Sequence, residues 1–319
     1  MEQRRSGRQK CSKGGEKLIR ISQLKLPITH TKAQLEKKIA KTLKNPGNSF
    51  TYEIKKQSLD CRHKNDKIFV YTVDVTIRDE QKLAKKVNNN NIMLTKEKPY
   101  EFPSPGETPL LHSPVIVGSG PAGLFCGWYL AKAGYCPIIL ERGEEAEKRQ
   151  KTVENFWKNG VLDPESNVQF GEGGAGTFSD GKLNTLVKDP YGRNHEVLKR
   201  FVAAGAPEEI IYQQKPHLGT DVLVGIVEKM RHEIEEMGGQ FCFRSKVTDL
   251  YTENGKLKAV EINHTEQVPA QVCVLAVGHS ARDTFFMLKD RGLAMEPKAF
   301  AVGLRIEHPQ SMINQDLYG

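Results

Sequence analysis

The sequence contains few cysteines and no closely paired ones. Its six cysteines, at positions 11, 61, 126, 136, 242 and 273, are scattered, and no C-x-x-C occurs. This spacing argues against a zinc site and against a disulfide framework. It also argues against an enzyme that passes electrons through a paired redox-active cysteine motif. We therefore predict no metal site.

Long apolar runs are missing as well. No stretch approaches the roughly 18 consecutive apolar residues of a membrane span, and the N-terminus lacks the apolar core of a secretory signal. These absences predict a cytoplasmic protein without a membrane span. With 319 residues, of which 38% are hydrophobic and 27% charged, the chain is long enough for two domains and a sizeable core.

Acidic residues are scarce in the first third of the chain. Residues 1–110 contain 24 Lys and Arg against 12 Asp and Glu, whereas residues 111–319 contain 23 against 27. Such asymmetry has two interpretations: a surface that contacts nucleic acid or membrane headgroups, or a solvated face. No aromatic-basic recognition motif accompanies it, so nucleic-acid binding through residues 1–98 stays an alternative.

Composition divides the chain into four segments. Residues 1–16 are basic and lack apolar periodicity, which predicts a disordered tail. Residues 17–98 contain strand patterns and a helix that Thr31 can cap, in an order that suggests a small α+β ferredoxin-like domain. Prolines and glycine mark residues 99–112 as a linker, and residues 113–319 form the second domain.

The most informative segment opens that second domain. Val115–Val117 has the pattern of a buried strand, and the G-x-G-x-x-G turn Gly118–Gly123 follows it. A helix comes next, and then a second apolar strand that ends at Glu141. A glycine turn in this strand–helix–strand context predicts the first βαβ unit of a dinucleotide-binding fold.

Each residue type in the turn has a physical reason. Gly118 permits the sharp turn, Gly120 lets the backbone approach a pyrophosphate, and Gly123 lets the helix pack closely on the sheet. Free N–H groups and the positive dipole end of the helix favour the phosphates. The predicted phosphate-binding residues are therefore Gly118, Ser119, Gly120, Pro121, Ala122 and Gly123.

An acid and a base follow at the end of the second strand. Glu141 lies 23 residues after Gly118, where a carboxylate holds the adenosine ribose and favours FAD or NAD over NADP. Arg142 has two interpretations, as a second ribose contact or as a surface charge.

Two later segments can also meet a nucleotide. Residues 171–181 include five glycines, which excludes a stable helix or a central strand and leaves either a flexible loop or one that lines a ligand. In the second case, the amides of Gly173, Gly174, Ala175 and Gly176 approach the pyrophosphate or a flavin. Val272–Gly278 is a second strand that ends in glycine, and His279 begins the segment after it.

Together these features resemble the glutathione-reductase-like flavoproteins with two dinucleotide-binding domains. Ala276-Val277-Gly278 resembles the ATG motif of that class, and Val247 lies where the class gives a backbone contact to adenine. Residues 169–185 and 215–221 are similar to an uncharacterised family of bacterial FAD-dependent dehydrogenases that also carries a basic N-terminal α/β domain. The resemblance covers residues 17–319.

The resemblance implies an α/β fold, with an FAD/NAD(P)-binding Rossmann-like domain that carries an inserted β-rich and helical segment. It implies that FAD is the cofactor and exchanges hydride with a small-molecule substrate. NAD(P)H could serve as electron donor or acceptor, although no dedicated domain for it is seen. The glycine-rich C-terminal motif of the class is missing, which suggests a chain that lacks its last segment. An NAD-binding protein without flavin remains a further alternative.

The chain offers few candidates for proton transfer. His217 has an ordinary pKa near neutrality, and Asp180 and Lys182 flank a glycine of the glycine-rich segment. Each of these side chains has an equally simple structural interpretation, so no catalytic residue is assigned. His279, Gly278 and Val277 are predicted to pack near the cofactor.

Overall fold

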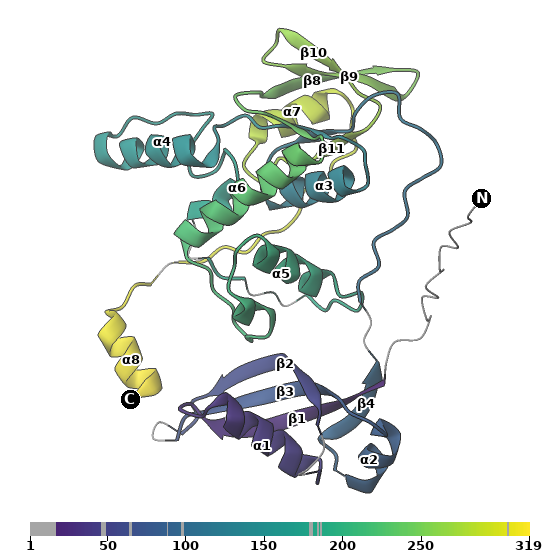
Figure 1. Cartoon of the computed structure of the whole chain (residues 1–319). Coiled ribbons are helices and arrows are strands. Elements are labelled where there is room, and N and C mark those ends of the chain that lie inside the picture. Colours follow the sequence, from purple (N-terminus) through teal and green to yellow (C-terminus); the bar gives the residue numbers. More distant parts are fainter. Residues whose placement is uncertain are drawn as a thin grey trace, which may run out of the picture.

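Two four-stranded sheets, one antiparallel and one parallel, mark two units in the chain (Figure 1). The computed structural model describes residues 17–45, 49–63, 66–87, 89–96, 99–178, 181–183, 185, 187–304 and 306–319. The predicted tail at residues 1–16 and the candidate Asp180 lie outside the described residues.

The N-terminal unit contains a four-stranded antiparallel sheet with the strand order β2-β3-β1-β4. Its elements follow one another as β1 (Lys17–Pro27), α1 (Lys32–Thr42), β2 (Thr51–Asp60), β3 (Ile68–Thr76), α2 (Glu80–Val87) and β4 (Ile92–Lys96). Strand β4 was not predicted, because its five residues are mostly exposed and show no clear alternation.

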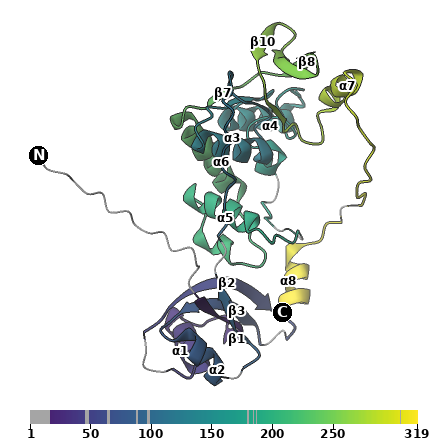
Figure 2. The same ribbon diagram turned by 90° about the vertical axis from the view of Figure 1, so that its right-hand side faces the viewer.

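Alternating side chains explain why this sheet packs on its helices. Tyr71, Val73 and Val75 of β3 are buried in one cluster with Leu35 and Ile39 of α1, as the periodicity predicts. The predicted cap of α1 is also confirmed, since Thr31 forms a capping box. The sheet lies between these helices and the second unit (Figures 1 and 2).

The second unit contains a parallel sheet with the order β11-β5-β6-β7. Its first half comprises β5 (Val115–Val117), α3 (Pro121–Lys132), β6 (Ile138–Leu140), α4 (Ala146–Asn159), the 3-10 helix η1 (Gly174–Phe178), α5 (Arg193–Ala203), η2 (Glu208–Ile211) and α6 (Thr220–Glu236). Its second half comprises β7 (Gln240–Cys242), β8 (Val247–Glu253), β9 (Lys256–Ile262), β10 (Glu266–Pro269), β11 (Cys273–Leu275), α7 (Arg282–Asp290) and α8 (Gln310–Tyr318).

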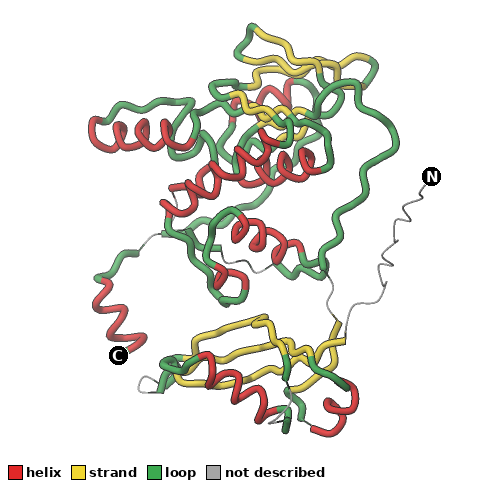
Figure 3. Tube along the Cα trace, in the orientation of Figure 1, coloured by secondary structure: helices red, strands yellow, loops and turns green. Residues whose placement is uncertain are grey.

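Both faces of the parallel sheet are covered. Helices α3 and α6 bury one face, around Ile116, Ile139 and Ile226. The antiparallel β8–β10 sheet and α7 cover the other, around Val115 and Leu140. Helices α3, α5 and α6 lie between the β8–β10 sheet and the N-terminal sheet (Figures 1 and 3). A parallel sheet covered on both faces is typical of doubly wound α/β domains.

Two local sequence patterns do not form the elements that they indicate. A Thr before an apolar helical stripe is typical of a cap, yet Thr220 is the first residue of α6, and Gly219 occupies the cap position without a side-chain hydrogen bond. The apolar pattern of residues 300–306 is typical of a strand, yet its described residues form no strand and Phe300 is 84% exposed. An apolar pattern needs a neighbouring strand before it can pair. Within the described part of the chain, no helix could span a membrane.

Candidate dinucleotide site

A cavity of about 530 Å³ lies at the carboxyl ends of β5, β6 and β11. Open α/β sheets bind their ligands at this edge. The predicted residues that line the cavity are Gly118, Gly120, Pro121, Ala122, Glu141, Arg142, Gly174, Ala175, Val247, Val277, Gly278 and His279.

The glycine turn is open on its cavity side. Gly118 has a φ of +100°, and a Cβ placed there would lie 2.6 Å from the Ala276 carbonyl oxygen. At Gly123, a Cβ would lie 1.9 Å from the Gly118 carbonyl oxygen, so both of these positions require glycine for the fold itself. A Cβ on Gly120 would meet Gly174 Cα at an ordinary 3.8 Å. The space beside Gly120 is therefore not needed for the packing of the fold and is open to a ligand.

Glu141 lies at the turn, but its carboxylate is already in use. One oxygen accepts hydrogen bonds from the main-chain N–H and the hydroxyl of Ser119, at 2.9 and 2.8 Å. The other accepts from the N–H groups of Gly143 and Gly171, at 2.9 and 3.0 Å. A carboxylate has about four acceptor sites, so a ribose hydroxyl could bind only if one of these donors yields. Glu141 thus ties the glycine turn to the glycine-rich segment.

A buried arginine orders the glycine-rich segment. Arg149 of α4 is 0% exposed, and its guanidinium donates hydrogen bonds to Thr177 Oγ1 and to main-chain carbonyls. Those carbonyls belong to Asn167, Val168, Gly171, Glu172 and Gly174. Burial lowers the pKa of Arg149 to about 10, which still leaves the side chain charged at neutral pH. The segment is therefore an ordered loop built around a cation.

The arginine also sets the direction of a peptide group at the cavity. Its Nη1 donates to the Gly174 carbonyl at 2.8 Å. Because C=O and N–H lie on opposite sides of a planar trans peptide, the Ala175 N–H points away from Arg149. Gly174 and Ala175 both line the cavity, so this peptide group forms part of its wall.

Glu172 joins the loop to two helices. Its carboxylate is fully buried, accepts from the Ala146 N–H at the start of α4 and pairs with Arg231 of α6. Burial raises the pKa of Glu172 against these contacts. Glu172 thus connects the loop to both α4 and α6.

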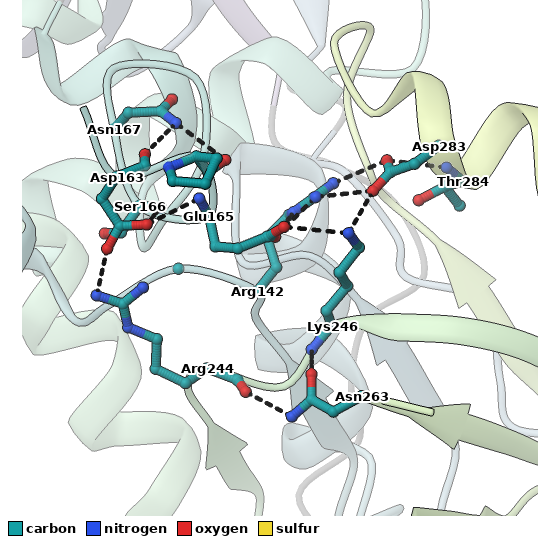
Figure 4. Close-up of polar contacts among 12 residues, drawn as sticks. Arg142, Asp163, Glu165, Ser166, Asn167, Arg244, Lys246, Asn263, Asp283 and Thr284 are labelled. Carbon is teal, nitrogen blue, oxygen red and sulfur yellow. Dashed lines mark hydrogen bonds and ion pairs between the residues drawn. The ribbon is translucent and has the colours of Figure 1, made fainter. Parts of the chain in front are cut away.

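Ionic contacts surround the other end of the cavity. Arg142 and Lys246 pair with Glu165 and Asp283, and nearby Arg244 pairs with Asp163 (Figure 4). Arg244 also pairs with Glu144. The network links residues just beyond β6 and before β8, the loop at residues 163–170 and the first turn of α7. Arg142 lies within this network, and its side chain is 14% exposed.

The structure separates the remaining candidates from the cavity. Lys182 and His217 face each other in an isolated antiparallel bridge, which joins the glycine-rich segment to residues 215–221. Both side chains are exposed, and neither lines the cavity. Ser119, Gly123, Gly173 and Gly176 belong to the surrounding framework rather than to the lining. The described residues contain no group of three or more His, Cys, Asp or Glu side chains suited to a metal ion.

Sequence reasoning missed Arg149, although a signal existed. Ala146, Arg149 and Val153 are the buried residues of α4 and lie on one face. A charged residue on the apolar face of a helix indicates a buried side chain that pairs with other buried polar groups. Glu165, Lys246 and Asp283 carried no comparable signal, because they meet only after the chain folds.

Comparisons with known proteins agree with the dinucleotide motif. Residues 116–151 match the NAD(P)-binding Rossmann-like domain, and residues 18–76 match a domain of unknown function (DUF8436). An uncharacterized protein of Clostridium beijerinckii (strain ATCC 51743 / NCIMB 8052) is 44% identical over 302 residues, which cover 94% of this chain and 56% of that protein. The chain thus spans just over half the length of this relative.

Solved structures are similar at a greater distance. Thermovibrio ammonificans THI4 is 19% identical, over 57% of this chain and 64% of that one, with a TM-score of 0.38. L-proline dehydrogenase from P. horikoshii is 15% identical, over 59% and 58%, with a TM-score of 0.33. The domain match and the strand order together define a Rossmann-like domain of the NAD(P)-binding class in the second unit.

Proposed function

We propose that the chain is part of an FAD-dependent oxidoreductase that exchanges hydride between bound FAD and a small-molecule substrate. The observation that carries the proposal is the open face of Gly120 in a cavity at the carboxyl ends of β5, β6 and β11. A pyrophosphate needs this unobstructed approach to a helix N-terminus. The predicted turn, its acid and the motif at Ala276–Gly278 all border the same cavity, which supports the proposal.

The residues present suit such a group. The pyrophosphate would lie on Gly118–Gly123 and face the Ala175 N–H, while the ribose would lie near Glu141 and the adenine near Val247. When bound, the flavin would supply the hydride chemistry. The chain would hold the cofactor in place, since Arg149 and Glu172 fix the loop that borders the cavity. Main-chain N–H groups near an anion stabilise it without further reorganisation.

The organisation of the chain belongs to the same proposal. We assign residues 17–98 to a ferredoxin-like domain, supported by the β-α-β-β-α-β order of its elements. Residues 99–112 would be the linker, and residues 113–319 the FAD-binding domain. The two alternatives, nucleic-acid association and NAD binding without flavin, have no specific contact in their favour.

The direct test is to identify the nucleotide that the chain carries. We expect the purified chain to show visible flavin absorption, or to acquire it with added FAD, and to release FAD on denaturation. A colourless protein whose melting temperature does not respond to FAD would contradict the proposal. Stabilisation by NAD alone would support a nicotinamide-binding protein instead.

A further inference from the structure

Two cations line the cavity beside the proposed ribose position, and two carboxylates bind them from outside the lining. Arg142 and Lys246 line the cavity, whereas their partners Glu165 and Asp283 do not. Figure 4 shows Arg142 and Lys246 pointing toward the same two acids. The four side chains carry no net charge together, so the cavity wall presents cations that are already neutralised.

The donors of Arg142 are largely committed. Its Nε donates to Glu165 at 2.7 Å, and its two Nη atoms donate to the two oxygens of Asp283 at 3.0 and 2.8 Å. The ring of Phe170 covers the guanidinium at 4.1 Å. An Arg that binds a phosphate normally offers this same bidentate fork. Here the fork is directed at Asp283.

The Lys246 ammonium bridges the same two acids. It lies 3.1 Å from Glu165 and 2.7 Å from Asp283. Burial raises the pKa of Asp283, but hydrogen bonds from Arg142 and Lys246 outweigh this effect and hold that pKa well below its ordinary value. Asp283 therefore remains ionised at physiological pH, and these four side chains together carry no net charge.

The pairing of Arg142 and Lys246 bears on whether the cavity can accept a 2′-phosphate on the ribose. In dinucleotide-binding folds, an acid near the ribose selects an unphosphorylated ribose, whereas a nearby Arg accommodates a 2′-phosphate. In the sequence, Glu141 favours an unphosphorylated ribose, whereas the adjacent Arg142 is the residue type that accommodates a 2′-phosphate. A 2′-phosphate would have to take Arg142 or Lys246 from carboxylates that hold them, and would then face those carboxylates unpaired.

We propose that Asp283 and Glu165 make the cavity select an unphosphorylated adenosine ribose, by pairing the two cations that would otherwise bind a 2′-phosphate. The inference rests on the proposed dinucleotide function and extends it to ligand selection. Asp283 and Glu165 act through Arg142 and Lys246, so they are positioning residues that need not touch the ligand.

The test compares two ligands that differ only in the 2′-phosphate, ADP-ribose and 2′-phospho-ADP-ribose, by calorimetry with the whole chain. We expect the wild-type chain to bind ADP-ribose more tightly. The double variant Asp283→Asn, Glu165→Gln should shift the ratio of the two affinities by at least about tenfold toward the phosphorylated ligand, because charge-assisted phosphate contacts become available. Adding Arg142→Gln to the double variant should remove most of that gain.

The ratio of the two affinities does not change if part of a variant is unfolded, since both ligands bind the same folded fraction. Asp60→Asn removes a carboxylate from an exposed pair with Arg62 in the other unit, and this control should leave the ratio unchanged. ADP-ribose binding with the same ratio in the wild type and the double variant would overturn the inference alone. Failure of both ligands to bind the wild type would overturn the proposed function together with the inference.

Discussion

At the scale of single residues, the three glycines of the turn have different duties. The fold requires Gly118 and Gly123, because a Cβ at either position would approach a main-chain carbonyl oxygen within 2.6 Å. Gly120 has φ −68° and ψ −176°, which any residue can adopt. A substitution at Gly120 can therefore test ligand binding without disturbing the fold.

We expect Gly120→Ala to weaken FAD binding at least about tenfold, while the free energy of unfolding changes by less than about 1 kcal/mol. Gly123→Ala should instead lower the free energy of unfolding by about 1–3 kcal/mol or more, because the backbone must move. Flavin titration and urea unfolding of both variants measure the two effects. Unchanged FAD affinity in Gly120→Ala would show that the turn does not hold the pyrophosphate.

At the scale of elements, the glycine-rich loop depends on helix α4. Arg149→Lys keeps the charge but replaces a planar fork of donors with a single ammonium, so several loop carbonyls would lose their partner. We expect this variant to lower the free energy of unfolding by about 2–4 kcal/mol and to weaken FAD binding as well.

The matched control is Arg62→Lys, at an arginine whose side chain is 79% exposed. Exposed pairs contribute about 0–1 kcal/mol, so this variant should match the wild type in both urea unfolding and flavin titration. Wild-type stability in Arg149→Lys would mean that the loop holds its shape without the arginine.

The elements also show how far the sequence could predict the site. The turn at Gly118–Gly123 was predictable because its glycines, strand and helix are neighbours in the chain. Arg142 and Asp283 lie 141 residues apart, and nothing local to either residue indicates the other. The saturation of Glu141 also depends on Gly171, whose position depends in turn on Arg149.

At the scale of the whole molecule, the two units have separate cores. The core around Ile19 and Val73 shares no residue with the cores around Ile116 or Val115. The units meet at Gln57 of β2, whose N–H donates to the Tyr212 carbonyl at 2.8 Å and whose carbonyl accepts from the Gln214 N–H at 2.9 Å. A small number of main-chain hydrogen bonds couples two cores weakly.

Separate cores predict two unfolding transitions. In scanning calorimetry, saturating FAD should raise the midpoint of one transition only, because a ligand stabilises the unit that binds it. The Val73 side chain is 0% exposed, so Val73→Ala leaves a cavity in the N-terminal core. This variant should lower the midpoint of the other transition and reduce the free energy of unfolding of that unit by about 1–3 kcal/mol. Arg149→Lys should lower the FAD-sensitive transition. A single transition that both substitutions and FAD move together would show that the Gln57 contact joins the units into one cooperative structure.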